Sequence, residues 1–403
     1  MAKKAEIEQT EIEAPYELPE GWRWKTLGNT CDMYQPKTIS TKELIDDGKY
    51  LVYGANGVIG RYDKYNHEKA QLLITCRGAT CGAVNISEPF SWINGNAMVI
   101  NPKDENLDLK YLAYIFQSEV NFNKVITGSA QPQITRQSLL PVIIPLPPTL
   151  AEQQRIVNRI ETMFAKLDQA QKKAQVVLDS FETRKAAILH KAFTGQLRID
   201  NEELKIEDWE DTTIGKCCRL GSGGTPSKSH PEYYENGDIP WLKTGEIDWN
   251  DIYDVEERIT NEGVENSSAK IFPAESVVVA MYGMGVTRGK AAIIKIPTAT
   301  NQAVCVLQPN EKLNNRFLFY YFMCNYWQIR EQSVGGNQLN LSGKIIASFP
   351  IKLPPLNYQL SIVNFLDTVL EKESHAKEAA QTVLDQIALL KKSILARAFR
   401  GEL

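Results

Sequence analysis

The stretch LAEQQRIVNRIETMFAKLDQAQKKAQVVLDSFETRKAAILHKAFTGQL, residues 150–197, indicates how the whole chain is organised, because the chain contains it twice. Residues 356–403 read LNYQLSIVNFLDTVLEKESHAKEAAQTVLDQIALLKKSILARAFRGEL. A constant shift aligns the two copies without a gap, with roughly 20 of about 48 positions identical. Identity of this extent within one chain indicates an internal repeat.

Apolar residues recur in both copies with the spacing of a coiled coil. They alternate steps of three and four residues over 157–192 and, at the equivalent places, over 363–398. A seven-residue repeat sustained this long forms a narrow apolar stripe, which predicts a left-handed coiled coil. One such segment alone would fit a core helix of a bundle, but two matched copies favour pairing with each other. Polar residues interrupt the stripe at matched positions and would set the register of the pairing: Gln171 and Lys377, then Lys185 and Lys391.

Both copies carry signals for where the helix starts and stops. A Pro-Pro pair precedes each copy, and Thr149 followed by Glu152 has the spacing of a capping box. The second copy has no acidic partner for its predicted cap, Asn357. Gly195 and Gly401 stand where a C-terminal stop is expected. At about 1.5 Å per residue, a run of about 44 residues predicts a rod of about 65 Å.

The composition is that of an ordinary globular protein, with 403 residues of which 43% are hydrophobic. The length allows two to four domains. Seven scattered cysteines without a CxxC pair are typical of a reduced, cytoplasmic protein. No apolar run is long enough for a secretion signal or a bilayer span. The four histidines lie far apart in the sequence, so no metal site is expected.

The net charge of −4 argues against a uniformly basic surface, but the acidic residues are unevenly distributed. Six glutamates fall within the first 20 residues, which leaves the globular segment behind them slightly basic. A nucleic acid is attracted by a local basic patch and does not require a basic protein. The charge therefore leaves a DNA-binding role open.

Strand-like and helical runs are mixed in the two segments outside the repeated helices. Helical runs fit 109–122 and 315–331. The strand-like runs are 51–53, 71–75, 97–100, 277–281, 291–294 and 303–307. We therefore predict an α+β fold with two mixed, strand-rich globular domains, separated by two long helices that form an antiparallel coiled coil.

This interpretation divides the chain into five consecutive parts. They are a charged N-terminal tail at 1–20, a first globular domain at 21–148, a first helix at 149–197, a second globular domain at 198–355 and a second helix at 356–403. Antiparallel helices would relate the two halves by a pseudo-two-fold axis. Such an axis matches the two-fold symmetry of duplex DNA, in which two half-sites are separated by a fixed gap.

Two short polar loops recur in both globular segments. GATCG at 78–82 is echoed by GVTRG at 285–289, and GSAQPQIT at 128–135 by GGNQLNLS at 335–342. Gln and Asn can bridge two atoms of an adenine edge and Arg two of guanine, while Ser and Thr bind either base or phosphate. A solvated turn is the alternative for any single residue. The candidate DNA-binding residues in and beside these loops are Arg77, Thr80, Ser129, Gln131, Gln133, Thr135, Arg136, Thr287, Arg288, Asn337, Gln338, Asn340, Ser342 and Lys344.

Other glycine-rich segments lack the context of a nucleotide-binding loop. GANGVIG at 54–60 has GxxGxxG spacing and no amphipathic helix after it, so a glycine-rich turn is favoured. GSGGTPSKS at 221–229 lacks the GK[ST] ending of a P-loop. The sequence contains no nucleophile elbow, HExxH motif or zinc-ligand spacing. We therefore expect neither catalytic residues nor a metal site in this chain.

Taken together, the motifs resemble those of specificity subunits of Type I restriction and modification systems, over nearly the full length of the chain. Two copies of an entry motif and two copies of an ending carry most of the resemblance, and two segments of the globular domains are also similar. The matching segments are LPPTLAEQQRIV at 146–157, LPPLNYQLSIV at 353–363, AFTGQL at 192–197, AFRGEL at 398–403, YGANG at 53–57, and GGTPS at 223–227 with Trp241.

The resemblance implies a non-catalytic DNA reader within a larger complex. Each globular domain would be a target recognition domain that reads one half of a bipartite, asymmetric DNA site in the major groove, and the coiled coil would set the spacing. Two modification subunits would bring S-adenosylmethionine and flip an adenine out of the duplex for N6 methylation. Restriction subunits would add translocation and cleavage driven by ATP with Mg. No cofactor would bind to this chain itself, and no membrane is implied.

Two other classes of protein remain as alternatives. A coiled-coil adaptor could use its two heads to bind protein or glycan, because heptads rarely specify a ligand. A free-standing DNA methyltransferase or nuclease would require a catalytic site of its own, and binding of S-adenosylmethionine by the purified chain would favour it.

Overall fold

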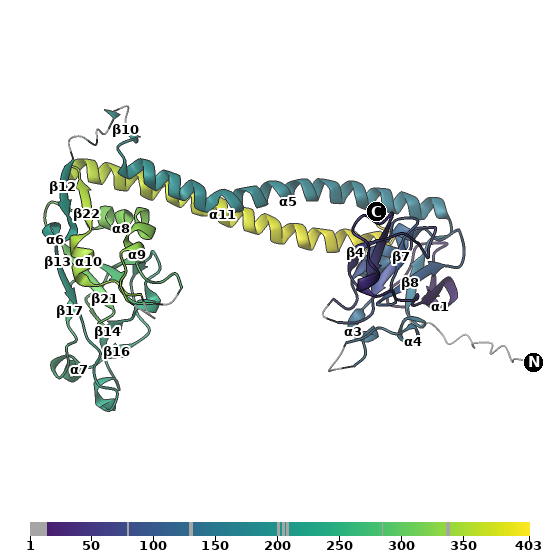
Figure 1. Ribbon diagram of the computed structural model, residues 1–403, viewed down its shortest axis with the longest axis horizontal. Helices are drawn as coiled ribbons and strands as arrows, with labels where there is room; N and C mark the ends of the chain where they lie inside the picture. Colours follow the sequence, from purple (N-terminus) through teal and green to yellow (C-terminus); the bar gives the residue numbers. More distant parts are fainter. Residues whose placement is uncertain are drawn as a thin grey trace, which may run out of the picture. The chain divides into compact units, whose positions relative to one another are not determined.

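The computed structural model describes residues 14–78, 80–128, 132–199, 202–203, 206, 209–283, 285–335 and 339–403 (Figure 1). The chain divides into two compact units. The first unit is Met1–Gln175 with Ala380–Leu403, and the second is Val176–Ala379. Two helices of 44 residues each, α5 (Leu150–Phe193) and α11 (Leu356–Phe399), cross from one unit into the other. Each unit therefore combines one globular domain with part of both long helices.

The first domain is a mixed α+β structure with two small sheets. One sheet has the strand order β2-β8-β5-β6 and is antiparallel throughout, and the other has the order β4-β3-β7. Strands β1 and β9 form a separate antiparallel pair. The elements are β1 (Arg23–Thr26), α1 (Leu27–Thr30), β2 (Cys31–Tyr34), η1 (Thr41–Glu43), β3 (Tyr50–Gly54), β4 (Gly57–Tyr62), β5 (Leu72–Thr75), β6 (Val84–Ile86), β7 (Trp92–Ile93), β8 (Ala97–Pro102), α2 (Leu109–Ser118), α3 (Phe122–Val125), α4 (Arg136–Leu139) and β9 (Ile143–Leu146).

The second domain repeats this plan with additions. Its main sheet has the order β13-β21-β18-β19-β15, and a second sheet has the order β16-β14-β20-β17. The elements are β10 (Arg198–Ile199), β11 (Glu202–Glu203), β12 (Glu210–Thr213), α6 (Ile214–Cys217), β13 (Cys218–Ser222), η3 (Pro231–Tyr233), β14 (Ile239–Leu242), η4 (Thr244–Glu246), β15 (Asp251–Ile252), β16 (Arg258–Ile259), α7 (Asn261–Glu265), β17 (Ile271–Phe272), β18 (Val277–Ala280), β19 (Ala291–Ile294), β20 (Thr298–Thr300), β21 (Val304–Pro309), α8 (Asn315–Cys324), α9 (Tyr326–Glu331), α10 (Gly343–Ser348) and β22 (Pro350–Leu353).

The internal repeat predicted from the sequence therefore extends to the fold of the domains. The antiparallel pair β1–β9 corresponds to β12–β22, and the sheet β2-β8-β5-β6 corresponds to β13-β21-β18-β19. Each predicted strand-like run contains or overlaps a strand, and the α+β class is confirmed. The residues at 54–60 form the β3–β4 hairpin with Gly54 paired to Gly57, as the predicted glycine-rich turn requires.

Helices α2 and α8 are shorter than predicted. The run at 109–122 ends as α2 at Ser118, and the run at 315–331 is divided into α8 and α9 at Asn325. Both the backbone N–H and the side-chain amide of Asn325 donate to the Tyr321 carbonyl at 3.0 Å. An asparagine side chain that competes for backbone acceptors in this way favours a helix end.

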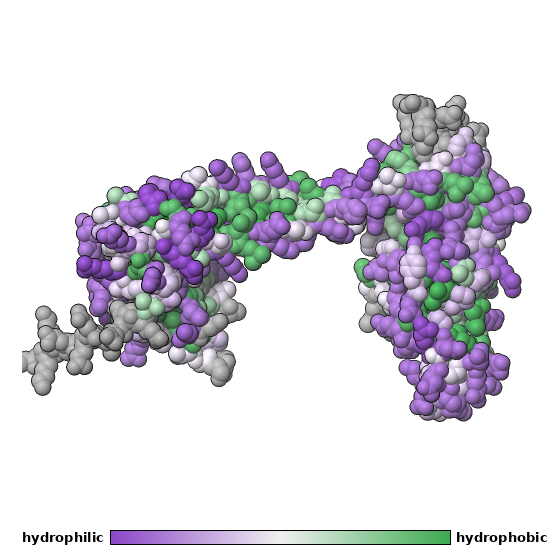
Figure 2. All heavy atoms as spheres, turned by 180° about the vertical axis from the view of Figure 1, so that it is seen from behind, coloured by the Kyte–Doolittle hydropathy of each residue, from purple (hydrophilic) through white to green (hydrophobic). Residues whose placement is uncertain are grey.

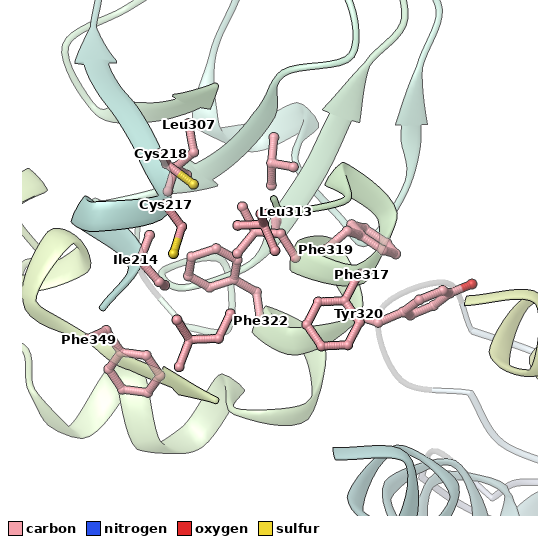
Figure 3. Close-up of a cluster of buried hydrophobic side chains, with 14 of the residues drawn as sticks. Ile214, Cys217, Cys218, Leu307, Leu313, Phe317, Phe319, Tyr320, Phe322 and Phe349 are labelled. Carbon is pink, nitrogen blue, oxygen red and sulfur yellow. The ribbon is translucent and has the colours of Figure 1, made fainter. Parts of the chain in front are cut away.

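The core of the second unit joins the sheet, the helices of the domain and both long helices. Figure 3 shows side chains from α6, β13, β21 and α8 gathered in one cluster, together with Phe349 just before β22. Phe193 at the end of α5 lies in the same core, with its ring centroid 5.1 Å from that of Phe317. The first unit repeats this contact, since Phe399 at the end of α11 lies 5.4 Å from Tyr111. The end of a long helix is thus part of the core of each domain.

Within the first unit, α5 and α11 run antiparallel. The Arg155 guanidinium of α5 donates to the carbonyl of Leu403 at 2.9 Å, whereas further along α5 the Asp168 carboxylate accepts from Lys391 at 2.5 Å. A later residue of α5 thus meets an earlier residue of the C-terminal segment. The Lys391 ammonium also lies 5.5 Å from the centroid of the Phe164 ring. This polar interruption of the apolar stripe is therefore matched by an aromatic ring and an acid.

The second unit shows the same antiparallel direction with different partners. The Arg184 guanidinium of α5 donates to the Glu373 carboxylate of α11 at 2.7 Å, and the Lys377 ammonium lies 4.5 Å from the centroid of the Phe181 ring. Burial lowers the pKa of Lys185. The aromatic rings in these contacts come from α5 and the lysines from α11, so the two copies of the repeat pair as unequal partners.

The helix ends agree with the sequence signals at three of four positions. The Glu152 N–H donates to the Thr149 hydroxyl at 3.2 Å, and both stop glycines have the left-handed backbone expected, with φ of 71° at Gly195 and 75° at Gly401. The predicted cap at Asn357 is wrong, because α11 already begins at Leu356. Its first backbone bonds run to the carbonyl of the preceding proline.

A buried glutamine in the first turn of each long helix fastens the helix to its domain. The Gln153 side chain of α5 is 3% exposed, accepts from the Asp108 N–H at 2.8 Å and donates to the Asn106 carbonyl at 3.0 Å. The Gln359 side chain of α11 is fully buried and makes the equivalent bonds to the Asn314 N–H and the Lys312 carbonyl, both at 2.8 Å, and a third to the Pro354 carbonyl. Every partner in these bonds is a main-chain group.

No helix among the described residues combines the length and the apolar character that crossing a membrane requires.

Candidate nucleic-acid interface

The repeated polar loops lie next to each other in the first domain. We call residues 78–82 the first glycine loop and residues 127–133 the first hairpin loop. The hairpin loop is closed by a reciprocal pair of backbone bonds between Thr127 and Gln133, both 2.9 Å. The neighbouring Ile134 N–H donates to the Cys76 carbonyl at 2.9 Å, and Arg77 and Gln133 form an isolated β-bridge. These bonds join two loops that are far apart in the sequence.

A cavity of about 400 Å³ opens where the two loops meet. It brings together four of the predicted DNA-binding residues, of which three have exposed side chains. The predicted residues are Arg77, Gln133, Thr135 and Arg136, and the others in the lining are Met33, Tyr34, Gln35, Met98 and Ile134. Two guanidinium groups and two amides around one cavity can hydrogen-bond the edges of base pairs.

The sequence interpretation missed Tyr34 and Gln35, which reach this cavity from the end of β2 and the segment after it. The Gln35 amide donates to the Gly95 carbonyl at 3.0 Å, which leaves its oxygen to accept from a ligand. Tyr34 is 42% exposed. Nothing in the local sequence marks these two residues, because strand β2 is brought to the loops only by its pairing with β8.

A chain of hydrogen bonds fixes the Tyr34 ring. The Asn66 oxygen accepts from the Ile93 N–H at 2.8 Å and lies 2.6 Å from Nδ1 of His67, so Nδ1 carries the proton. The other ring nitrogen, Nε2, then accepts from the Tyr34 hydroxyl at 2.9 Å. Burial lowers the pKa of His67 and raises that of Tyr34. His67 is therefore a neutral imidazole that orients an aromatic ring at the edge of the cavity.

Acidification is expected to destabilise the first unit through His67. The folded-state pKa of His67 lies below its ordinary value of about 6.5, so the unfolded chain binds the proton more readily and stability falls as the pH drops through that value. The His67→Gln variant keeps a donor and an acceptor without a titrating group. Thermal unfolding between about pH 7.5 and 5.5 should show a steeper loss of Tm in the wild type than in the variant. Parallel curves would contradict the assignment of a neutral, buried imidazole.

The second domain also brings the corresponding loops together, with a side-chain contact in addition. We call residues 285–289 the second glycine loop and residues 334–340 the second hairpin loop. The hairpin loop is closed by backbone bonds between Val334 and Asn340 of 3.0 and 2.9 Å. The Arg288 guanidinium of the glycine loop donates to the Leu339 carbonyl of the hairpin loop at 2.6 Å. The Leu341 N–H donates to the Met281 carbonyl at 3.0 Å, as the Ile134 N–H does to Cys76 in the first domain, and the Arg288 side chain adds a further link between the loops.

Three polar atoms near this junction are buried without a hydrogen-bond partner in the part of the chain that the structure describes. They are Nε of Arg288, the hydroxyl of Ser333 and the side-chain oxygen of Asn340. A buried polar atom left unpaired costs about 1–3 kcal/mol, and such atoms are uncommon in native proteins. The junction of the two loops thus holds unused hydrogen-bonding capacity.

The remaining predicted residues differ in exposure and in whether their side chains already form hydrogen bonds within the protein. The Thr135 and Ser342 hydroxyls cap α4 and α10 by accepting from the N–H groups of Ser138 and Ile345, which leaves each O–H free to donate. Thr80 and Lys344 are exposed, and Thr287 is half-buried. The predicted residues that lie outside the described part of the chain are Ser129, Gln131, Asn337 and Gln338.

These observations define a class of protein: a two-domain binder that carries a repeated pair of polar loops on a repeated sheet scaffold, with two repeated helices fastened to the domains. A family model described as the Type I restriction modification DNA specificity domain matches residues 19–178 and again residues 206–383. The chain therefore belongs to the family of Type I restriction-modification DNA specificity proteins, and it contains two such domains.

Known proteins agree with this assignment. The chain is 30% identical over 163 residues to the Type I restriction enzyme EcoR124I/EcoR124II specificity subunit of Escherichia coli, a match that covers 40% of this chain and 40% of that subunit. It is 22% identical over 359 residues to the EcoBI specificity subunit of Escherichia coli, covering 82% of this chain and 73% of that one. A solved chain from work on complex assembly and conformational transition of the type I R-M system has the same fold, with a TM-score of 0.73, 20% identity, and coverage of 96% and 100%.

Proposed function

We propose that this chain is the sequence-reading subunit of a Type I restriction-modification complex and that each domain reads one half of a bipartite, asymmetric DNA site in the major groove. The observation that carries the proposal is the pair of repeated loops. Both domains place a glycine loop beside a hairpin loop, and both loops carry Arg, Asn, Gln or Thr side chains suited to base edges and phosphates.

Differences between the domains support two unequal half-sites. Strand β2 ends with Tyr34 beside the first cavity, whereas β13, which starts at Cys218 as β2 starts at Cys31, has Gly221 at that place. A side chain at Gly221 would meet the Phe272 ring at 2.8 Å. The same scaffold thus presents an aromatic ring in one domain and a bare backbone in the other.

The long helices are proposed to act as an antiparallel coiled coil that sets the gap between the half-sites, with a pseudo-two-fold axis relating the halves of the chain. Support comes from the antiparallel contacts within each unit and from the matched glutamine attachments, Gln153 and Gln359. A spacer of fixed length and a symmetric attachment are what two half-sites at a fixed distance require.

The partners we propose are two modification subunits and the restriction subunits of the complex. Figure 2 shows hydrophobic residues exposed along the long helices. Within the first unit, Leu389 is 66% exposed and Leu390 49%, both on α11. Exposed apolar side chains of this size suit docking to another protein. Methylation with S-adenosylmethionine, and translocation and cleavage with ATP and Mg, would be carried out by those partners in the cytoplasm, and this chain itself would be non-catalytic and bind no cofactor or metal.

The methylated DNA sequence of a host tests the proposal directly. We expect that co-expression of this chain with a Type I modification subunit, in a strain without other adenine methyltransferases, produces N6-methyladenine in one bipartite sequence with two different halves. Long-read sequencing of the genomic DNA measures this pattern, and a strain without this chain is the control. A continuous or palindromic target that depends on this chain would contradict the proposal.

A further inference from the structure

The second glycine loop is held in place by side chains of helix α9. The Arg330 guanidinium donates to the Gly285 carbonyl at 2.7 Å and also to the Arg288 carbonyl, and the Tyr326 hydroxyl donates to the Val286 carbonyl. Three of the five carbonyls in the loop are thus directed toward α9. Among the hydrogen bonds between described residues, none uses the backbone N–H of Val286 or Arg288 as donor. The loop therefore uses most of its carbonyl acceptors in contacts with the protein, and the N–H groups of Val286 and Arg288 are available to donate to a ligand.

Aromatic rings hold Arg330 in the position that this contact requires. Its Cζ lies 5.1 Å from the centroid of the Tyr326 ring and 5.6 Å from that of Trp327. The Tyr326 ring packs in turn against Trp249, with centroids 5.5 Å apart. A planar guanidinium packed against aromatic rings is preorganised, so it can bridge two carbonyls with little further loss of conformational freedom.

The arrangement concentrates positive charge beside unsatisfied polar atoms. Neither Arg288 nor Arg330 takes part in an ion pair among the described residues, whereas Lys290 and Arg316 of the same domain are paired with aspartates. Burial and the nearby Arg330 lower the pKa of Arg288. Nε of Arg288 and the hydroxyl of Ser333 are buried without partners. Two guanidinium groups without a carboxylate partner favour an anion as a ligand.

The first domain does not have this arrangement in the residues that the structure describes. There α3 places Phe122 against Gly82, 3.1 Å from where a side chain would start. The first glycine loop is closed by its own backbone, since the Cys81 N–H donates to the Gly78 carbonyl at 3.0 Å. Among the described residues, an arginine that bridges the carbonyls of the glycine loop, as Arg330 does, is therefore found in the second domain and not in the first.

We propose that Arg330 is a positioning residue for the second domain and that the site it builds binds a backbone phosphate of the DNA beside the second half-site. Arg330 holds the second glycine loop so that its N–H groups and the Arg288 guanidinium contact the phosphate. Because the Arg288 guanidinium also donates to the Leu339 carbonyl, the phosphate contact positions Leu339 and the neighbouring Asn340 beside the bases. The inference rests on the proposed function and adds that the two half-sites are recognised by unequal means.

The test is the methylation pattern and DNA binding of Arg330→Ala in the complete complex. We expect the first half of the methylated sequence to stay unchanged and base preferences in the second half to relax. Affinity for a duplex carrying the wild-type sequence should fall about tenfold, and the slope of log K against log salt concentration should become shallower by about one. Arg330→Lys should not restore the second half, because an ammonium lacks the planar fork that bridges two carbonyls.

Arg316→Ala is the matched control. Arg316 of α8 also stacks on aromatic rings, at 5.3 Å from Phe319, but its charge is paired with Asp251 and Asp367. We expect it to lower the Tm without changing either half-sequence. An unchanged sequence and salt slope in a folded Arg330→Ala variant, equal losses in both halves, or full rescue by lysine would overturn the inference. Absence of any bipartite methylated sequence with the wild-type chain would instead overturn the proposed function.

Discussion

Removing residues 169–175 from α5 together with residues 383–389 from α11 is expected to leave both half-sequences unchanged and to shorten the gap between them by about three base pairs. Seven residues of helix span about 10.5 Å, and three base pairs of B-DNA span about 10 Å. The deleted segments lie opposite each other in the antiparallel register. The Asp168–Lys391 and Arg184–Glu373 ion pairs lie outside both segments.

A variant that lacks residues 169–175 of α5 only should be compared with the paired deletion. It removes a heptad from one side of the pairing, so the ion pairs on either side of the deletion can no longer form together, and we expect an altered gap or loss of methylation. The methylated sequence in genomic DNA measures both variants, and thermal unfolding shows whether each one folds. An unaltered gap with full methylation in the paired deletion would defeat the idea that the helices set the spacing.

Replacing the buried glutamines, Gln153→Ala or Gln359→Ala, is expected to lower the free energy of unfolding by about 3 kcal/mol each. Each side chain satisfies main-chain N–H and C=O groups that become buried and unpaired when the amide is removed. The exposed neighbour Gln154→Ala is the matched control, with an expected change within about 0.5 kcal/mol. Denaturation with urea measures these differences.

Hydrogen exchange locates the effect of each glutamine. The Asp108 N–H donates to the Gln153 side chain and the Asn314 N–H to the Gln359 side chain. Each hydrogen bond protects its amide from exchange. We expect faster exchange at Asp108 only in Gln153→Ala and at Asn314 only in Gln359→Ala, because each glutamine belongs to a different unit. Unchanged exchange at both amides would show that the glutamines do not fasten the helices to the domains.

The long helices and the strands could be predicted because their signals are local. An apolar stripe needs only the side chains of one segment, and a duplicated segment indicates its own partner. The same reasoning located the polar loops, since recurrence of a motif does not depend on knowing the fold. Arg77, Gln133, Thr135 and Arg136 were each predicted as DNA-binding candidates, and the structure places them around one cavity.

The features that could not be predicted depend on contacts between distant segments. Tyr34 joins the cavity only through the pairing of β2 with β8, and Arg330 acts on a loop more than 40 residues earlier in the chain. The buried glutamines were visible as part of a repeated motif, but their burial follows from how each domain packs on its helix. Asn357 was misjudged because a proline carbonyl supplies the acceptor that a capping side chain would otherwise provide.

The attachment of each domain through main-chain atoms has a consequence for how such proteins diversify. Gln153 and Gln359 bind peptide N–H and C=O groups, which every residue type other than proline supplies, so the joint does not depend on the side chains of the domain it holds. A foreign domain that keeps the backbone course of this loop would be seated in the same way after genetic exchange. We therefore expect that exchange of a whole globular domain can change the DNA preference without changes to the long helices.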